Sequence, residues 1–181
     1  MLKSVLCVSA LLGVVAIPSA GCSDDVIDMV DVPEEPEEEF PPGPAVVRLI
    51  PSRPVYDVGS RVEVQVVIDN ASNVGAIPFK LRYDSQVLAF VPPAVEGPFM
   101  GSDGADTVFL ASDVPGAAEV AVGLSRLSRV GIGGSGTLAV FEFDAVAIGN
   151  CGFAFASASV KDPEGRNLPA AFYPVPVSVE P

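Results

Sequence analysis

Two pairs of carboxylates stand close enough in the sequence to do chemistry together. Asp103 and Asp106 lie in SDGADT, and Asp162 and Glu164 lie in DPEGR. Paired carboxylates serve in general acid–base catalysis, but the 181 residues include no histidine, the usual general base and the usual partner of a serine or cysteine nucleophile. Each pair also lies beside Gly or Pro, where carboxylates commonly hydrogen-bond to the backbone of a turn. We therefore expect two turns, no catalytic residue and no enzyme.

Calcium is the alternative at Asp103 and Asp106, because Ca²⁺ prefers carboxylate and carbonyl oxygens as ligands. The segment SDGADT lacks the full series of oxygen ligands of a calcium loop. We expect no metal and no cofactor, with calcium at these two residues as the open alternative.

The segment GIGGSG, residues 131–136, has the glycine spacing of a dinucleotide-binding loop. Such a loop holds pyrophosphate at the N-terminus of the helix that follows it. Here TLAVFEF follows, which has the composition of a strand. We expect a glycine-rich connection between strands and no nucleotide site.

The N-terminus has the form of an export signal. Lys3 precedes an apolar run from Val5 to Ile17, which is too short to span a bilayer. The residues that follow, Ser19 to Cys22, resemble the lipobox of bacterial lipoproteins, in which cleavage leaves a lipid-carrying cysteine at the new N-terminus. This resemblance implies that residues 1–21 are a lipoprotein signal peptide, that Cys22 is lipidated and that the protein is exported.

The next segment, residues 22–45, has the composition of a disordered linker. It contains nine acidic residues, no basic ones and five prolines. Charge repulsion and proline stiffness keep such a segment extended. With a net charge of −13 and no basic cluster, the chain is not expected to bind nucleic acid, or membranes except through the lipid. By resemblance to lipoproteins, Ser23 after the lipidated cysteine favours the outer membrane or cell surface.

Residues 46–181 have the pattern of an all-β domain. Apolar residues alternate with polar ones, as in RVEVQVVID, and Gly, Pro, Asp and Asn separate the segments. In TLAVFEFDAV the alternation changes phase, so we expect a β-bulge near Val140 that turns Val140 to the core. Cys151 is the only thiol of this domain, so no disulfide can form within it. We expect Cys151 to serve as a small apolar side chain buried in the core. Nine segments are expected to be strands: 46–50, 61–69, 76–83, 87–91, 106–112, 118–125, 137–146, 151–160 and 173–179.

Several of these segments, in order, resemble a cohesin domain. They are VYDVGSRVEVQVVIDNASNVGAIPFKLRYDSQVLAFV, EGPFM, AVGLSR and GSGTLAVFEFDAV. The resemblance implies a two-sheet, nine-stranded jelly-roll sandwich, related in fold to carbohydrate-binding modules. Cohesins bind dockerin modules in cellulosomes, so it also implies a non-catalytic binding module.

The resemblance places partner binding on the outer face of the sheet that contains residues 76–83. The best-known cellulosomal cohesins tend to carry Asn and Asp on this strand, where this chain has Ala76 and Pro78. Lys80 and Arg82 alternate with apolar residues and should face outward, with Arg126 near the end of a neighbouring strand. These five residues are the predicted contacts, and as surface side chains Lys80 and Arg82 should add little to stability.

A dockerin-like protein is thus the expected partner, and the resemblance also links the domain to polysaccharide breakdown. Carbohydrate binding and a spacer role in an envelope assembly stay open as alternatives. Sugar-binding faces stack sugar rings on exposed aromatic side chains, and the chain has no Trp and three Tyr. Tyr83 should face the core, which leaves Tyr56 and Tyr173.

The lipobox generates the first testable prediction. Cys22→Ala should abolish lipid attachment, because the sequence has no other segment suited to hold the mature chain to a membrane. Mass spectrometry and detergent partitioning of the expressed protein measure this. An unchanged mass with unchanged partitioning would contradict lipidation.

Overall fold

The computed structural model describes residues 43–181. The predicted signal peptide, Cys22 and all but the last residues of the predicted linker lie outside this part of the chain. The first strand begins at Ala45, one residue before the predicted start of the domain. No helix within the described residues has the length and hydropathy needed to cross a bilayer.

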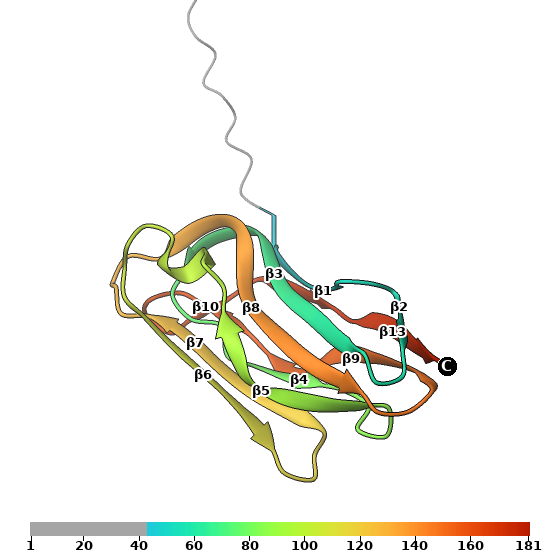
Figure 1. Ribbon diagram of the computed structural model, residues 1–181. Coiled ribbons are helices and arrows are strands. Elements are labelled where there is room, and N and C mark those ends of the chain that lie inside the picture. The colour runs from blue at the N-terminus through green and yellow to red at the C-terminus, as the bar shows by residue number, and fades with distance from the viewer. Residues whose placement is uncertain (1–42) are drawn as a thin grey trace, which may run out of the picture. The chain divides into compact units, whose positions relative to one another are not determined.

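The described chain folds into two packed β-sheets (Figure 1). All neighbouring strands are antiparallel except the pairs β1–β12 and β2–β13. The five-stranded sheet has the order β12 (Ala170–Tyr173), β1 (Ala45–Pro51), β3 (Arg61–Val74), β8 (Ile132–Ala145) and β5 (Leu88–Glu96). The six-stranded sheet has the order β2 (Val55–Asp57), β13 (Val175–Glu180), β9 (Gly149–Ala158), β4 (Phe79–Arg82), β7 (Glu119–Arg126) and β6 (Thr107–Val114). A short pair, β10 (Val160–Lys161) with β11 (Asn167–Leu168), and the 3-10 turn η1 (Phe99–Gly101) complete it.

The predicted all-β sandwich is confirmed, and each of the nine predicted segments overlaps a strand of the two main sheets, although β3, β5 and β8 extend beyond the predicted bounds. The structure adds the short strands β2, β10, β11 and β12. These have two to four residues each, and none shows a regular alternation of apolar and polar side chains in the sequence.

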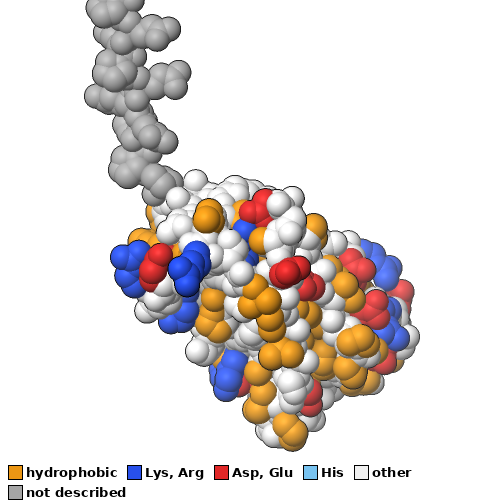
Figure 2. Space-filling model, turned by 90° about the vertical axis from the view of Figure 1, so that its left-hand side faces the viewer, with side chains coloured by type: hydrophobic (Ala, Val, Ile, Leu, Met, Phe, Trp, Pro, Cys, Tyr) orange, Lys and Arg blue, Asp and Glu red, His pale blue; other side chains and the backbone are white. Residues whose placement is uncertain are grey.

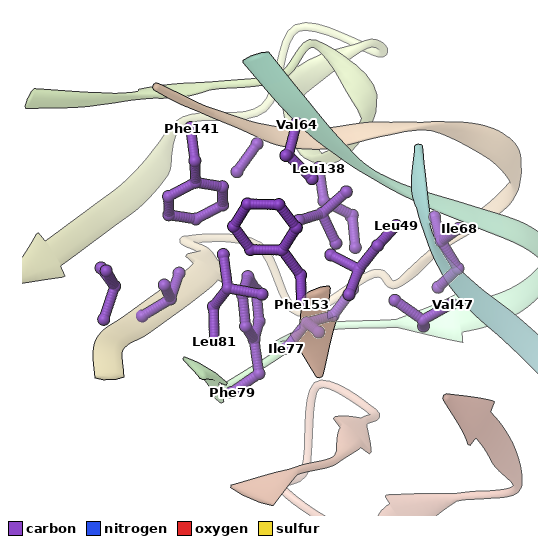
Figure 3. Close-up of a cluster of buried hydrophobic side chains, with 14 of the residues drawn as sticks. Val47, Leu49, Val64, Ile68, Ile77, Phe79, Leu81, Leu138, Phe141 and Phe153 are labelled. Atoms are coloured by element: carbon purple, nitrogen blue, oxygen red, sulfur yellow. The ribbon is translucent and has the colours of Figure 1, made fainter. Parts of the chain in front are cut away.

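Alternation along the strands determines which side chains enter the core. On β3, Val62, Val64, Val66 and Ile68 are fully buried, while the residues between them face outward. Figure 3 shows side chains from both sheets meeting in one cluster, with Phe153 at its centre. The core thus forms where the apolar sides of the two sheets face each other.

Aromatic rings hold one end of this core. The ring of Phe143 lies 4.8 Å from Phe153, 5.1 Å from Tyr83 and 5.5 Å from Phe90, centroid to centroid. These residues come from β8, β9, β5 and the segment after β4, so the rings join both sheets. The prediction that Tyr83 faces the core is confirmed, since its ring packs there.

The expected bulge in β8 is present, but Val140 does not turn inward. The pairing with β3 passes from Ala139 to Thr137 and skips Leu138, so Leu138 and Ala139 are both buried. Val140 pairs with Gln65 and lies half-buried, away from the core. The bulge thus sits two residues earlier than the position that would turn Val140 to the core.

The glycine-rich segment 131–136 belongs largely to β8 itself, where a connection between strands was expected. It pairs with the end of β3, Ile132 with Val74 and Gly134 with Ala71. A Cβ on Gly131 would come within 2.4 Å of the backbone of Asn73, so the close approach of these strands requires glycine. A strand and not a helix follows, which confirms that the nucleotide-loop geometry is missing from this segment.

The first described residues are attached to the sandwich. The Asn70 side chain donates a hydrogen bond to the Gly43 carbonyl at 2.8 Å, and the Ala45 amide donates to Pro169 at 3.0 Å. From Ala45 onward β1 lies between β3 and β12 and pairs with both.

Truncation of an aromatic side chain in the core should strongly destabilise the domain. Phe143→Ala removes a fully buried ring with three aromatic neighbours, so we expect a loss of about 3–5 kcal/mol in the free energy of unfolding. Urea denaturation of residues 43–181, followed by circular dichroism, measures it. Val130→Ala, at a 72% exposed side chain, is the control and should change stability by less than about 0.5 kcal/mol. Equal effects of the two substitutions would contradict this description of the core.

Candidate functional site

The two sheets present different outer surfaces to solvent. On the five-stranded sheet, Arg48 pairs with Asp69, and Arg61 pairs with Glu142 at 2.7 Å and Asp144 at 3.1 Å. All of these side chains are more than a third exposed, as in an ordinary solvated sheet surface. This face offers a partner mainly charges that are already paired.

The six-stranded sheet presents small and apolar side chains instead, on a surface that we call the β4 face. Cross-strand pairing aligns Leu110 on β6 with Gly123 on β7, and Lys80 on β4 with Ala121 on β7 and Ser157 on β9. The β4 face is defined by the outward-facing residues Lys80, Arg82, Leu110, Ser112, Ala121, Gly123 and Ser157.

A broad groove of about 820 Å³ crosses the β4 face. Gly123 and Ala121 leave its floor low, because neither has a long side chain, and Leu110 borders it on β6. Two of the predicted contact residues, Pro78 and Lys80, line this groove. Lys161 and Asn167, from β10 and β11, also line it, and they were not predicted because these two-residue strands are too short to show a pattern in the sequence.

Lys80 and Arg82 have an intramolecular partner, Glu119, which was not predicted from the sequence. Arg82 donates two hydrogen bonds to Glu119, at 2.7 and 3.2 Å, and the Lys80 ammonium lies 3.4 Å from the other carboxylate oxygen. The Glu119 side chain is only 10% exposed, between two cations that are about half exposed. Hydrogen bonds from Arg82, with smaller effects of Lys80, lower the pKa of Glu119 despite its burial. The two cations therefore neutralise a buried charge and are not free surface groups.

Arg126 does not lie on the β4 face, which corrects its assignment as a contact residue. Its side chain is 1% exposed, and its guanidinium donates to the Met100 carbonyl and, at 2.6 Å, to Asp103. Residues on β7 alternate inward and outward, and Arg126 falls on the inward series of Val122 and Leu124. Arg126 thus fastens the loop around η1 to the end of β7.

The same contact bears on the calcium hypothesis. The Arg126 guanidinium lowers the pKa of Asp103 through its hydrogen bond, and the Asp103 carboxylate also accepts from the Ala105 amide in a turn. The backbone carbonyl of Asp106 accepts from the Leu127 amide. Within residues 43–181, no cluster of three or more acidic or sulfur ligands is present.

The second carboxylate pair forms the turn between β10 and β11. Burial raises the pKa of Asp162, but hydrogen bonds from the backbone and guanidinium of Arg166 outweigh it, so the pKa is lowered overall. Glu164 meets the same guanidinium at 3.1 Å. Both carboxylates thus have the expected role, since they stabilise a turn.

Ala76 and Pro78 lie where β4 begins, between β7 and β10. Ala76 is half-buried and exchanges backbone hydrogen bonds with Lys161 at 2.8 and 3.1 Å. Pro78 is exposed, and its carbonyl accepts from Ser159. Of these two positions, Pro78 presents its side chain more openly to a partner.

No aromatic platform lies on either outer face of the part of the chain that the structure describes. Tyr56 is 1% exposed, and its hydroxyl meets Ser52 and the Arg53 amide. Tyr173 is 53% exposed, but it lies on β12 in the other sheet. The only aromatic residue that lines the groove, Phe79, is 3% exposed.

Comparison with solved structures shows the fold. A type II cohesin domain from the cellulosome of Acetivibrio cellulolyticus matches with a TM-score of 0.65 and 16% identity, over 75% of this chain and 95% of that one. A non-cellulosomal cohesin from the archaeon Archaeoglobus fulgidus matches with a TM-score of 0.61 and 20% identity, over 77% and 93%. The sixth cohesin of Acetivibrio cellulolyticus scaffoldin B, in complex with a dockerin, matches with a TM-score of 0.63 and 16% identity, over 76% and 100%.

Comparison with curated proteins found no match. At the level of families, the cohesin domain matches residues 49–159, which is more than half of the chain and runs from β1 to the end of β9. This match covers the core of both sheets and most of the β4 face. The chain therefore belongs to the cohesin domain family.

Proposed function

We propose that this domain is a non-catalytic module that binds a dockerin-like protein on the β4 face. The observation that carries the proposal is the groove of about 820 Å³, which is broad, open and floored by Gly123 and Ala121. An open groove of this kind admits a protein surface, whereas small ligands are usually held in enclosed pockets. Solved cohesins of similar fold occur in complexes with dockerins, which supports the same type of partner here.

Recognition at this face should depend on shape and on lysine. Ala76 and Pro78 cannot donate side-chain hydrogen bonds, so the polar contacts expected at these positions of a cellulosomal cohesin have no counterpart. Lys80 and Lys161 border the groove, but Lys80 is paired with Glu119, so Lys161 is the cation that favours a partner with acidic or carbonyl groups beside an apolar contact surface. We infer a partner that differs in sequence from those of the cellulosomal cohesins.

Carbohydrate binding receives less support. Sugar rings stack on exposed aromatic side chains, and the exposed aromatic residue Tyr173 lies away from the groove. The serines and small side chains of the β4 face offer hydrogen bonds but no stacking surface.

We further propose that the domain is exported and lipid-anchored through Cys22, with the acidic linker between the lipid and Gly43. An anchored binding module of this kind would hold a soluble partner at the cell surface. A partner with a polysaccharide-degrading domain would bring that activity to the envelope.

The main test fills the groove without disturbing the core. A Cβ on Gly123 meets no atom within 4 Å, and its φ is not positive, so Gly123→Phe should fold normally. The ring would occupy the floor of the groove and should weaken binding of dockerin modules from the source genome at least tenfold, about 1.4 kcal/mol. Surface plasmon resonance with immobilised residues 43–181 measures the change in Kd.

The matched control places the same ring on the other sheet. Gln65 faces outward on β3, so Gln65→Phe adds an exposed ring far from the groove and should leave Kd unchanged. Equal binding by both variants would move the site away from the β4 face. Binding of insoluble cellulose or xylan, with no binding of any dockerin module, would replace this function with the carbohydrate alternative.

Because of Glu119, replacing Lys80 and Arg82 should lower the stability of the domain, where the sequence predicted almost no effect. Lys80→Ala with Arg82→Ala leaves a nearly buried carboxylate without donors, so we expect a lower Tm at pH 7, contrary to the behaviour of ordinary surface residues. The lowered pKa of Glu119 means that its stabilising effect is complete above the unfolded pKa near 4.5 and is lost as the pH falls through the folded value. The difference in Tm from the unmodified domain should therefore be largest at pH 7 and shrink toward pH 3.

A third substitution provides the control for this experiment. Adding Glu119→Gln to the double variant removes the unpaired charge and should recover much of the Tm at pH 7. Thermal melts by circular dichroism at a series of pH values give both results. A double variant that melts like the unmodified domain at every pH would show that Glu119 needs neither cation.

A further inference from the structure

The free edges of the two sheets differ in how well they are protected. An open edge can pair with another strand, and proteins usually block it with short strands, prolines or bulges. β12 and β2 have four and three residues, and Pro169, Pro174 or Pro54 flanks them. β5 contains Pro92 and Pro93, and its pairing with β8 breaks between Val91 and Val95.

β6 has none of these protections. Its eight residues pair with β7 without a break, from Thr107 to Val114, and include no Pro, no Lys and a single charge, Asp113. Within the described chain, β7 is the only strand that pairs with it. In Figure 1 it forms the outermost strand of its sheet, beyond β7.

The edge is also apolar on its outer side. Leu110, on the β4 face, is 68% exposed, and Val108, which points to the same side of the sheet, is 38% exposed. Figure 2, which views the molecule from the left of Figure 1, shows hydrophobic side chains grouped over the lower half of the surface. A long, regular and apolar edge of this kind is suited to strand addition.

We propose that β6 pairs antiparallel with β6 of a second copy of this chain, about a twofold axis at Leu110. The two six-stranded sheets then form one continuous sheet. This proposal concerns the edge of the sheet and does not depend on the partner that the groove binds.

The sequence of β6 is complementary to itself in this register. Residues directly opposite each other in an antiparallel pair point to the same face of the sheet. The twofold axis must therefore lie between the two copies of one residue, and not between two successive residues. With the axis at Leu110, Val108 lies opposite Ser112, Phe109 opposite Ala111, and Thr107 opposite Asp113. Seven strand residues pair, the two Leu110 side chains meet each other on the axis, Val108 and Phe109 meet smaller side chains, and no like charges face each other.

The neighbouring registers are worse. With the axis at Ala111, Phe109 of each copy would lie opposite Asp113 of the other, so that an apolar ring would face a carboxylate on both sides of the axis. An axis at Phe109 would pair only five residues of the strand. The match between the strand and its own inverted copy is the reason to favour a second copy over an unrelated extended peptide.

The arrangement has a consequence for the groove. Leu110 borders the groove in each copy, so the two grooves would meet at the axis on the same side of the joined sheet. A dimer would thus present two adjacent grooves, one for each of two partners.

Cysteine cross-linking tests the register directly. In residues 43–181 with Cys151→Ser, Leu110→Cys would place two thiols on the axis, with Cα atoms about 4.5–5.5 Å apart, within the range of a disulfide. Val108→Cys is the matched control, because the two copies of this residue would lie about 14 Å apart along the strands. With copper phenanthroline as oxidant, we expect covalent dimers of the first variant only, on non-reducing gels.

A second test places charges at Leu110 and requires no disulfide bond. Leu110→Lys and Leu110→Glu should each weaken dimerisation at least tenfold in sedimentation equilibrium, because like charges would meet on the axis. Mixing the two should restore dimers, now as a heterodimer. Chains that stay monomeric at all concentrations, or cross-linking of Val108→Cys as efficient as that of Leu110→Cys, would overturn the proposal. Because no dockerin is present, these outcomes are independent of the proposed function.

Discussion

The burial of apolar side chains between two sheets is the interaction on which this domain depends. Residues 43–181 contain a single cysteine, so no disulfide within the domain can compensate for a weak core. Phe143 on β8 and Phe153 on β9 join the sheets, and the bulge at Leu138 lets β8 bury two consecutive residues where a regular strand would bury one. Because the core holds both sheets firmly, their outer faces are free to carry small or unusual residues.

Glu119 determines what the β4 face can offer a partner. A nearly buried carboxylate needs donors, and Lys80 and Arg82 provide them from the neighbouring strand. Part of the positive charge on this face is thereby used within the domain. The rest of the face is a low, open groove with small side chains on its floor.

The sequence predicted the sandwich well because alternation over four or more residues is a strong signal, as on β3 and β4. It failed where a side chain's role depends on distant residues. Arg126 looked like a surface cation, but its partners, Asp103 and the Met100 carbonyl, lie more than twenty residues away in the chain. The role of Glu119 was missed for the same reason, since it lies 37 positions after Arg82 in the sequence.

The position of β1 determines how the domain would respond to a mechanical load. The chain enters the fold at Gly43, held by Asn70, and β1 then runs between β3 and β12 with hydrogen bonds on both sides. These bonds lie across the strand direction, so a pull along β1 from the chain before Gly43 would load them together in shear instead of opening them one by one. A force applied at Gly43 along β1 would thus act in the direction in which the first strand resists best.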